Sequence, residues 1–180
     1  HKTAVEPAQQ DREGIIAGST DEMEEIFRRE FAKIQAAFSA SFVRLFGGGQ
    51  GNLALEDAGD VLNCGIDIQV QPPGKSLRTI SLLSGGERAL VAIALYFAIL
   101  EVHPTPFCVV DEVEAALDEA NGQRFIHCLQ AMAGETQFIL ITHRRSTMEG
   151  ADVLYGVTME HQGVSQVLML DLEQAEALLG

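Results

Sequence analysis

The fold of this chain is decided by the stretch Phe107-Cys108-Val109-Val110-Asp111-Glu112. Its apolar residues predict a buried β-strand, and the two carboxylates follow directly at the end of that strand. Adjacent carboxylates are a poor structural choice there, because nothing apolar can cover both charges. At the carboxyl end of a parallel strand, however, α/β proteins place their ligand chemistry. The alternative interpretation is a solvated loop without chemistry.

The residue types at this strand end suit nucleotide chemistry. An Asp such as Asp111 can hold Mg²⁺ on nucleotide phosphates, directly or through water. The adjacent Glu112 can orient and deprotonate an attacking water, and general-base catalysis of this kind contributes about 10²- to 10⁴-fold. His143 follows a second apolar run, Phe138–Ile141, and can donate a hydrogen bond to a γ-phosphate if the two strands are neighbours. A lone His after a strand is more often structural, so His143 alone is weak evidence.

The pattern from Ser84 onward is that of an α/β protein. Apolar strands alternate with helices, which favours a parallel sheet with helices covering both faces. Two further strands are predicted around the turn Gln162-Gly163, and a short amphipathic helix ends the chain. The predicted elements are a helix from Ser84 to about Val102, a strand at Phe107–Val110, a helix at Glu119–Met132, and strands at Phe138–Ile141, about Val153–Thr158 and Val164–Leu170.

The first part of the chain predicts one long helix. Residues 1–20 show no sustained periodicity and are interpreted as a linker-like lead-in. Ser19 and Glu22 have the spacing of a capping box, and a helix is expected over residues 21–46, with apolar residues every three or four positions. Gly47-Gly48-Gly49 should end it. Residues 47–180 are then one lobe, which starts with two half-buried antiparallel strands at Leu53–Glu56 and Ile66–Val70.

A second motif is Leu83-Ser84-Gly85-Gly86-Glu87, which opens the helix that follows. Ser84 and Glu87 again have capping-box spacing, so the motif can be an ordinary helix start. The two glycines also let a ligand approach the backbone, and free N–H groups at a helix N-terminus favour a phosphate. From the residues alone, both interpretations stand.

One apparent nucleotide motif fails. Pro73-Gly74-Lys75-Ser76 has the Gly-Lys-Ser ending of a phosphate-binding P-loop, but that loop needs a Gly where this chain has Gln69. The two prolines at 72 and 73 also remove N–H donors from the segment that would cradle the phosphates. Lys75 is the only Lys that follows a Gly, so a Walker A loop is not expected in this sequence.

Composition sets broader limits. The 180 residues carry 26 acidic and 12 basic side chains, a formal net charge of −14, which argues against a broad DNA-binding surface on this piece alone. The apolar runs fall short of the roughly 18 residues of a membrane span, so no membrane association is expected. Cys64, Cys108 and Cys128 suggest neither disulfides nor zinc, which fits a reducing cytosol. The start at His1, without Met, is interpreted as an internal cut from a longer chain.

Taken in order, these motifs resemble the C-terminal portion of the head of a structural-maintenance-of-chromosomes (SMC) protein. Leu83–Glu87 looks like the ABC signature, Phe107–Glu112 like Walker B, Ala116-Leu117-Asp118 like the D-loop, and His143 like the switch histidine. The end of the signature is Glu87, as in SMC proteins, where other ABC ATPases commonly have Gln. The resemblance covers about residues 23–170. The segments that resemble the bacterial branch are Leu45–Gly49, Pro106–Cys108, Asp111–Asp118, Thr142–Arg145, Ala151–Met159 and Gly163–Ser165.

The resemblance implies a role for each site residue. Asp111 would help to coordinate Mg²⁺, Glu112 would be the catalytic base and His143 would contact the γ-phosphate. The signature would bind the γ-phosphate of ATP held by an opposite head, and Asp118 would couple the two ATP sites. The signature residues in question are Ser84, Gly85, Gly86 and Glu87.

The resemblance also implies an assembly. The fold would be the C-terminal lobe of an ABC-type ATPase head, a parallel sheet flanked by helices, with the helix at 21–46 entering from the coiled-coil neck. The lobe would pair with the N-terminal half of the same head, which carries Walker A, and then with a second head to sandwich ATP and Mg²⁺. A kleisin subunit and, through the whole complex, DNA would be further partners. The expected location is the cytoplasm, on the nucleoid.

Three alternatives remain open at this point. One is the head lobe of a related coiled-coil ABC ATPase of DNA repair, which the segment Leu154–Met159 makes less favoured. Another is a non-catalytic lobe that binds kleisin as a scaffold, against which Glu112 and His143 argue. A transporter nucleotide-binding domain is disfavoured, because its Walker A loop and signature normally share one continuous chain.

Overall fold

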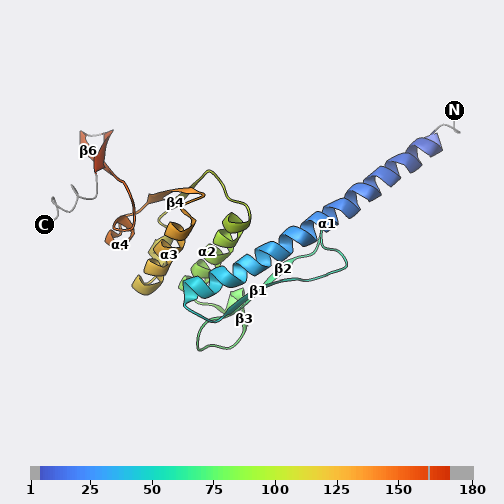
Figure 1. Cartoon of the computed structure of the whole chain (residues 1–180), viewed down its shortest axis with the longest axis horizontal. Coiled ribbons are helices and arrows are strands. Elements are labelled where there is room, and N and C mark those ends of the chain that lie inside the picture. The colour runs from blue at the N-terminus through green and yellow to red at the C-terminus, as the bar shows by residue number, and fades with distance from the viewer. Residues whose placement is uncertain (1–4, 162, 171–180) are drawn as a thin grey trace. The chain divides into compact units, whose positions relative to one another are not determined.

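The computed structural model describes residues 5–161 and 163–170. The chain divides into two compact units, His1–Pro104 and Thr105–Gly180. Helices and strands occur in both units, and the second contains a parallel strand pair, so the predicted α/β class is confirmed (Figure 1). None of the described helices is long and apolar enough to cross a membrane.

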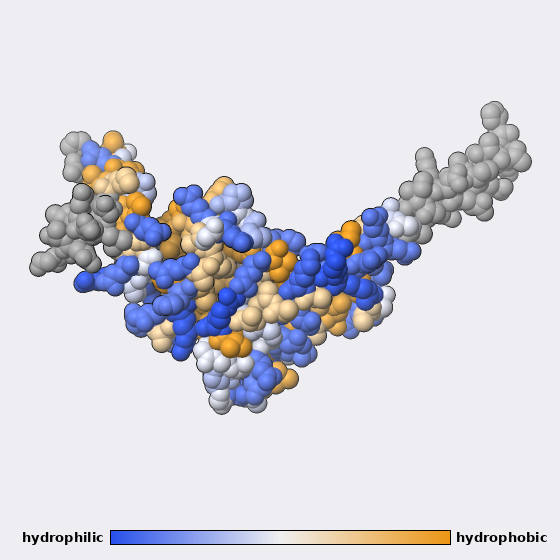
Figure 2. All heavy atoms as spheres, viewed as in Figure 1, coloured by the Kyte–Doolittle hydropathy of each residue, from blue (hydrophilic) through white to orange (hydrophobic). Residues whose placement is uncertain are grey.

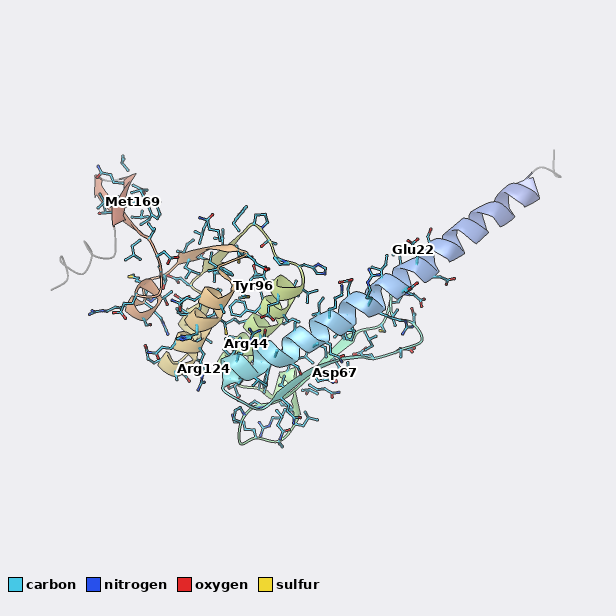
Figure 3. The ribbon with its side chains drawn as sticks, in the orientation of Figure 1. Glu22, Arg44, Asp67, Tyr96, Arg124 and Met169 are labelled. Atoms are coloured by element: carbon cyan, nitrogen blue, oxygen red, sulfur yellow. The ribbon has the colours of Figure 1, made fainter. Side chains whose placement is uncertain are left out.

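The first unit is built on α1 (Val5–Phe46), which lies against β1 (Gln50–Leu55) and α2 (Gly85–Val102) (Figure 1). The predicted apolar spacing gives α1 a buried face near its end, where Phe38, Phe42 and Leu45 are 0% exposed. Arg44, labelled in Figure 3, forms an ion pair with Glu101 of α2.

The helix begins earlier than the sequence predicts, at Val5, so the predicted lead-in is helical from that residue on. Pro7 is tolerated because it lies in the first turn, where a backbone N–H has no partner within the helix. Gly18 is exposed inside the helix and costs only about 1 kcal/mol there. Ser19 and Glu22 therefore lie within α1 and form no helix start.

The predicted strands of the first unit are confirmed. β1 pairs antiparallel with β2 (Ile66–Gln71), and a short strand that the sequence did not predict, β3 (Arg78–Thr79), pairs with β2. Gly51 of β1 sits directly on α1, since a Cβ there would lie 2.7 Å from Cγ of Phe42. A 3₁₀ turn, η1 (Ile80–Leu82), then leads into α2.

The second unit contains the strand that decided the fold. β4 (Phe107–Asp111) pairs in parallel with β5 (Gln137–Ile141), with Asp111 opposite Ile141. The helix between them, α3, has the predicted bounds Glu119–Met132. The remaining elements are η2 (Val113–Ala116), α4 (Arg145–Met148), β6 (Leu154–His161) and β7 (Val164–Leu170).

The predicted coverage of both sheet faces is wrong for the described chain. Cys108 and Val110 are buried at 4% and 6% exposure, but their neighbours on the opposite face are about half exposed. That open face is formed by Phe107, Val109, Ile139 and Ile141. Among the described residues of the second unit, this apolar face therefore has no covering layer.

β6 and β7 form an antiparallel hairpin around the predicted turn. Its side chains are largely apolar and exposed, with Tyr155 at 63%, Val157 at 72% and Met169 at 66%, and Figure 2 shows apolar colour over this hairpin. The amphipathic helix predicted for the end of the chain lies outside the described residues.

Candidate functional site

The parallel pairing of β4 with β5 brings two loops to one sheet edge. Carboxyl ends of parallel strands meet at the same edge. The backbone N–H of Glu112 extends this pairing, since it donates to the carbonyl of Ile141 at 2.9 Å. Asp111 ends β4, Glu112 follows it, and His143 follows β5, so the pairing of β4 with β5 meets the condition under which the sequence predicted that they lie near one another.

Glu112 and His143 are in direct contact. Oε1 of Glu112 lies 3.2 Å from Nδ1 of His143, and their side chains are 57% and 72% exposed. A carboxylate and an imidazole at hydrogen-bond distance can orient each other and pass a proton. Their exposure leaves both groups accessible to a ligand or a water molecule.

The backbone at Glu112 is strained. Its φ of 48° and ψ of 24° lie in the left-handed region, and it is the only non-glycine residue with positive φ in the described part of the chain. Such a conformation costs on the order of 1–3 kcal/mol and concentrates at functional sites. Nothing in the sequence indicated this turn, because Glu has no preference for it.

A second glutamate in the same loop, Glu114, has a different environment. It is 4% exposed, and its Oε1 accepts hydrogen bonds from the hydroxyl of Thr142 and, at 3.5 Å, from that of Thr147. Glu114 thus joins the loop after β4 to the residue just before His143. Sequence reasoning assigned Glu114 no role of its own, since no periodicity separates buried from exposed carboxylates in so short a loop.

The rest of the loop is held by hydrogen bonds. Arg144 donates to the carbonyls of Ala115 and Leu117, the latter at 3.0 Å. Asp118 is the N-cap of α3 and accepts from the N–H of Asn121 at 2.8 Å. The carboxylate of Asp118 therefore caps α3, in addition to the coupling of two ATP sites that the resemblance implies for it.

The carboxylates suit a magnesium ion that also binds a nucleotide. Asp111 is exposed at the end of β4, with Glu112 next to it. The described residues bring together no group of three or more possible metal ligands. Mg²⁺ needs no such group, since it is commonly held by one or two carboxylates together with phosphates and waters. Asp111 with Glu112 is compatible with that requirement.

The start of α2 forms the capping box that the sequence predicted. Oγ of Ser84 accepts from the N–H of Glu87 at 3.4 Å, and Oε2 of Glu87 accepts from the N–H of Ser84 at 3.1 Å and from its hydroxyl at 2.8 Å. Gly85 leaves the backbone open, since a Cβ there would meet nothing within 4 Å. Gly86 follows it in the first turn of α2. The same segment therefore forms a capped helix start and leaves the backbone at Gly85 open to a ligand.

The side chain of Lys75 also reaches this helix start. Its Nζ lies 2.8 Å from Oε1 of Glu87. That hydrogen bond, followed by those from Ser84, lowers the pKa of Glu87 to about 2. The segment with Lys75 joins β2 to β3, whereas a P-loop joins a strand to a helix, so its exclusion as a P-loop agrees with the structure.

Known proteins are similar to this chain in sequence. The family model described as "RecF/RecN/SMC N terminal domain" matches residues 17–166. The Chromosome partition protein Smc of Bacillus subtilis is 54% identical over 162 residues, which are 90% of this chain and 14% of that protein. The protein of the same name from Cereibacter sphaeroides is 46% identical over 180 residues, 99% of this chain and 16% of that protein. The chain therefore spans a small part of these relatives.

Solved structures share the fold. The chain described as "Structural biochemistry of ATP-driven dimerization and DNA stimulated activation of SMC ATPases" has a TM-score of 0.79 at 40% identity, over 87% of this chain and 94% of that chain. The Smc head domain with an extended coiled coil bound to the C-terminal domain of ScpA, from Pyrococcus furiosus, has a TM-score of 0.82 at 39% identity, over 99% of this chain and 45% of that chain. The chain belongs to the RecF/RecN/SMC family and matches the head region of its SMC members.

Proposed function

We propose that this chain is the C-terminal half of an SMC ATPase head, which hydrolyses ATP only when its N-terminal half and a second head are present. The observation that carries the proposal is the meeting of Asp111, Glu112 and His143 at one edge of the β4–β5 pair, with Glu112 and His143 3.2 Å apart. A carboxylate for a cation, a base and a hydrogen-bond donor are the groups that phosphoryl transfer to water requires.

Each residue at this edge has a proposed role. Asp111 helps to hold Mg²⁺, which when bound neutralises charge on the phosphates. Glu112 orients the attacking water and accepts its proton on a carboxylate oxygen. His143 donates a hydrogen bond to the γ-phosphate, and its contact with Glu112 holds both side chains over the same reacting group. The left-handed backbone of Glu112 supports this role, since such strain is retained where it serves a site.

The signature acts on a different nucleotide. Ser84, Gly85 and Gly86 bind the γ-phosphate of ATP held by the second head, through the Ser84 hydroxyl and the backbone N–H groups that open α2. Glu87 positions the backbone of Ser84 through the capping box, since its Oε2 accepts from the N–H of Ser84. Asp118 couples the two sites across the pair of heads, from its position at the start of α3.

Two observations support an incomplete head. The open face of the β4–β5 pair is apolar, with Phe107 at 60% and Ile141 at 50% exposure, and apolar sheet faces of this kind are normally covered. The solved Smc head of Pyrococcus furiosus is about twice as long, since this chain matches 45% of it. We propose that the N-terminal half, which carries Walker A, covers this face.

The wider assembly is proposed by analogy with the relatives. Residues 21–46 of α1 are the proposed neck helix leading to the coiled coil, and residues 47–180 the lobe itself. A kleisin subunit is a proposed partner, because solved heads with this fold are bound to ScpA domains. The relatives are named chromosome partition proteins, so chromosome condensation and segregation on DNA, in the cytoplasm at the nucleoid, is the proposed cellular role.

The direct test measures ATP turnover by this chain alone and with an N-terminal head fragment added. We expect no turnover alone and Mg²⁺-dependent turnover in the mixture. Robust hydrolysis by the isolated chain would contradict the half-head proposal.

Ser84→Arg provides the test of the signature. A bulky cation cannot fit against the phosphate there, so this variant should abolish ATP-dependent pairing of heads in sedimentation experiments.

A further inference from the structure

The lysine of the rejected Gly74-Lys75-Ser76 motif contacts the signature. Its Nζ lies 2.8 Å from Oε1 of Glu87, and the Lys75 and Glu87 side chains are 46% and 18% exposed. Sequence reasoning excluded Lys75 as a P-loop lysine and gave it no other role. The structure gives it a specific partner in the first turn of α2.

Glu87 links Lys75 to Ser84. One carboxylate oxygen, Oε1, faces Lys75, and the other, Oε2, accepts from the N–H and the hydroxyl of Ser84 at 3.1 and 2.8 Å. A glutamate is ionised at neutral pH already at its ordinary pKa of 4.5, and the hydrogen bond from Lys75 is the largest cause that lowers the pKa of Glu87 further, to about 2. A full negative charge therefore lies next to the Ser84 hydroxyl.

This charge conflicts with the proposed ligand. If Ser84 and its neighbours bind the γ-phosphate of a second head, an uncompensated carboxylate at Glu87 would repel that phosphate. Gln, which other ABC ATPases commonly have at this position, carries no charge and causes no such conflict. The ammonium group of Lys75 lies where it cancels the charge of Glu87.

We propose that Lys75 is a positioning residue of the signature, which neutralises Glu87 and holds it in place so that the γ-phosphate of ATP on a second head can approach Ser84. This inference rests on the proposed function. When the Ser84 hydroxyl turns from Glu87 to the phosphate, Glu87 keeps two hydrogen bonds, from Lys75 and from the N–H of Ser84. The carboxylate thus stays in place while Ser84 changes partner.

The competing explanation is an ordinary surface ion pair, which contributes little to the stability of the protein. Lys33 offers a matched control, because it is 54% exposed and its Nζ lies 3.0 Å from Oε1 of Glu30 in α1. Both lysines have the same kind of contact, but only Lys75 touches the signature.

The experiment uses the complete head, this chain with its N-terminal half, and measures the ATP-dependent pairing constant by analytical ultracentrifugation. Lys75→Ala should weaken pairing about tenfold, whereas Lys75→Arg and Lys33→Ala should leave it within about twofold of wild type. In the Glu87→Gln background, Lys75→Ala should change pairing by less than about twofold, because no charge remains to be cancelled.

The outcomes separate the two claims. A wild-type head that does not pair with ATP overturns the proposed function, and this inference with it. A wild-type head that pairs while Lys75→Ala pairs equally well overturns the inference alone. A Lys75→Ala defect that is undiminished in the Glu87→Gln background, or a Glu87→Gln head that does not pair at all, also overturns it, because neutralisation of Glu87 would then not be the cause.

Discussion

The loop after β4 and the start of α2 both place a glutamate at a proposed nucleotide contact, but they do so in opposite ways. Glu112 has a left-handed backbone and a side chain that is 57% exposed. Glu87 lies in the regular first turn of a helix, and its carboxylate accepts hydrogen bonds from Ser84 and Lys75. The difference shows that the surrounding fold holds Glu112 in place at a cost in backbone strain. Glu87 is instead held by hydrogen bonds from its neighbours Ser84 and Lys75.

The largest expected effect tests the loop after β4. In the assembled head, Glu112→Gln should lower the rate of phosphate release by about 10²- to 10⁴-fold, because the amide cannot accept the proton of the attacking water. ATP-dependent pairing should persist, since the amide keeps the size of the side chain. Glu119→Gln is the control, an exposed carboxylate a few residues further along. Unchanged hydrolysis by Glu112→Gln would remove this residue from the role of base.

The next effect separates the two glutamates of that loop by stability. Glu114→Leu should lower the free energy of unfolding by about 1–3 kcal/mol, because the hydroxyls of Thr142 and Thr147 lose their buried acceptor. Glu114→Gln should cost less, since its carbonyl oxygen can still accept both bonds. Urea unfolding of the chain measures this. Equal stability of the Leu variant and wild type would show that Glu114 does not hold the loop.

A smaller effect of opposite sign should follow from the strain at Glu112. Glu112→Gly should raise the free energy of unfolding by about 1 kcal/mol, because glycine adopts positive φ without steric cost, although its greater freedom in the unfolded chain offsets part of the gain. Ser84→Ala, which removes a cap at the start of α2, should lower it by about 1 kcal/mol. Destabilisation by Glu112→Gly would contradict the stored strain.

The start of α2 could be predicted because its geometry is local. Ser84 and Glu87 are three residues apart, and their mutual hydrogen bonds need only the first turn of a helix. The predicted bounds of α3 also agree with the structure, where Asp118 caps the first turn by accepting from the N–H of Asn121. The early start of α1 was missed because a proline in a first turn and one exposed glycine are weak interruptions of a long helix.

The loop after β4 could be predicted only in part. Parallel pairing indicated that His143 would lie at the same sheet edge as Glu112. Neither the hydrogen-bond contact of the two side chains nor the left-handed turn at Glu112 has a sequence signal. Both depend on the tertiary arrangement of β4 and β5. Burial of Glu114 and the contact of Lys75 with Glu87 depend likewise on hydrogen bonds between separated segments. The open sheet face was missed because an apolar strand does not indicate which chain covers it.

The smallest expected effect is a pH dependence at the start of α2. The folded pKa of Glu87, about 2, lies below its ordinary value of 4.5, mainly because of the hydrogen bond from Lys75. Ionised Glu87 therefore stabilises the fold fully above pH 4.5, and this contribution is lost as the pH falls through about 2. Lys75 is 46% exposed, so solvent screening should limit the effect to less than about 1 kcal/mol.

This dependence should be visible as a difference between variants, because the contributions of groups that the substitution leaves unchanged cancel in the subtraction. The free energy of unfolding of wild type minus that of Lys75→Ala should be positive at neutral pH and should shrink toward zero as Glu87 becomes protonated. The same subtraction with Lys33→Ala measures an ion pair outside the signature, because the hydrogen bond from Lys33 also lowers the pKa of Glu30. If the difference in free energy of unfolding stays constant down to the most acidic samples, Lys75 stabilises the helix start by packing its carbon chain. The charge of Glu87 would then not be what distinguishes the start of α2 from the strained loop at Glu112.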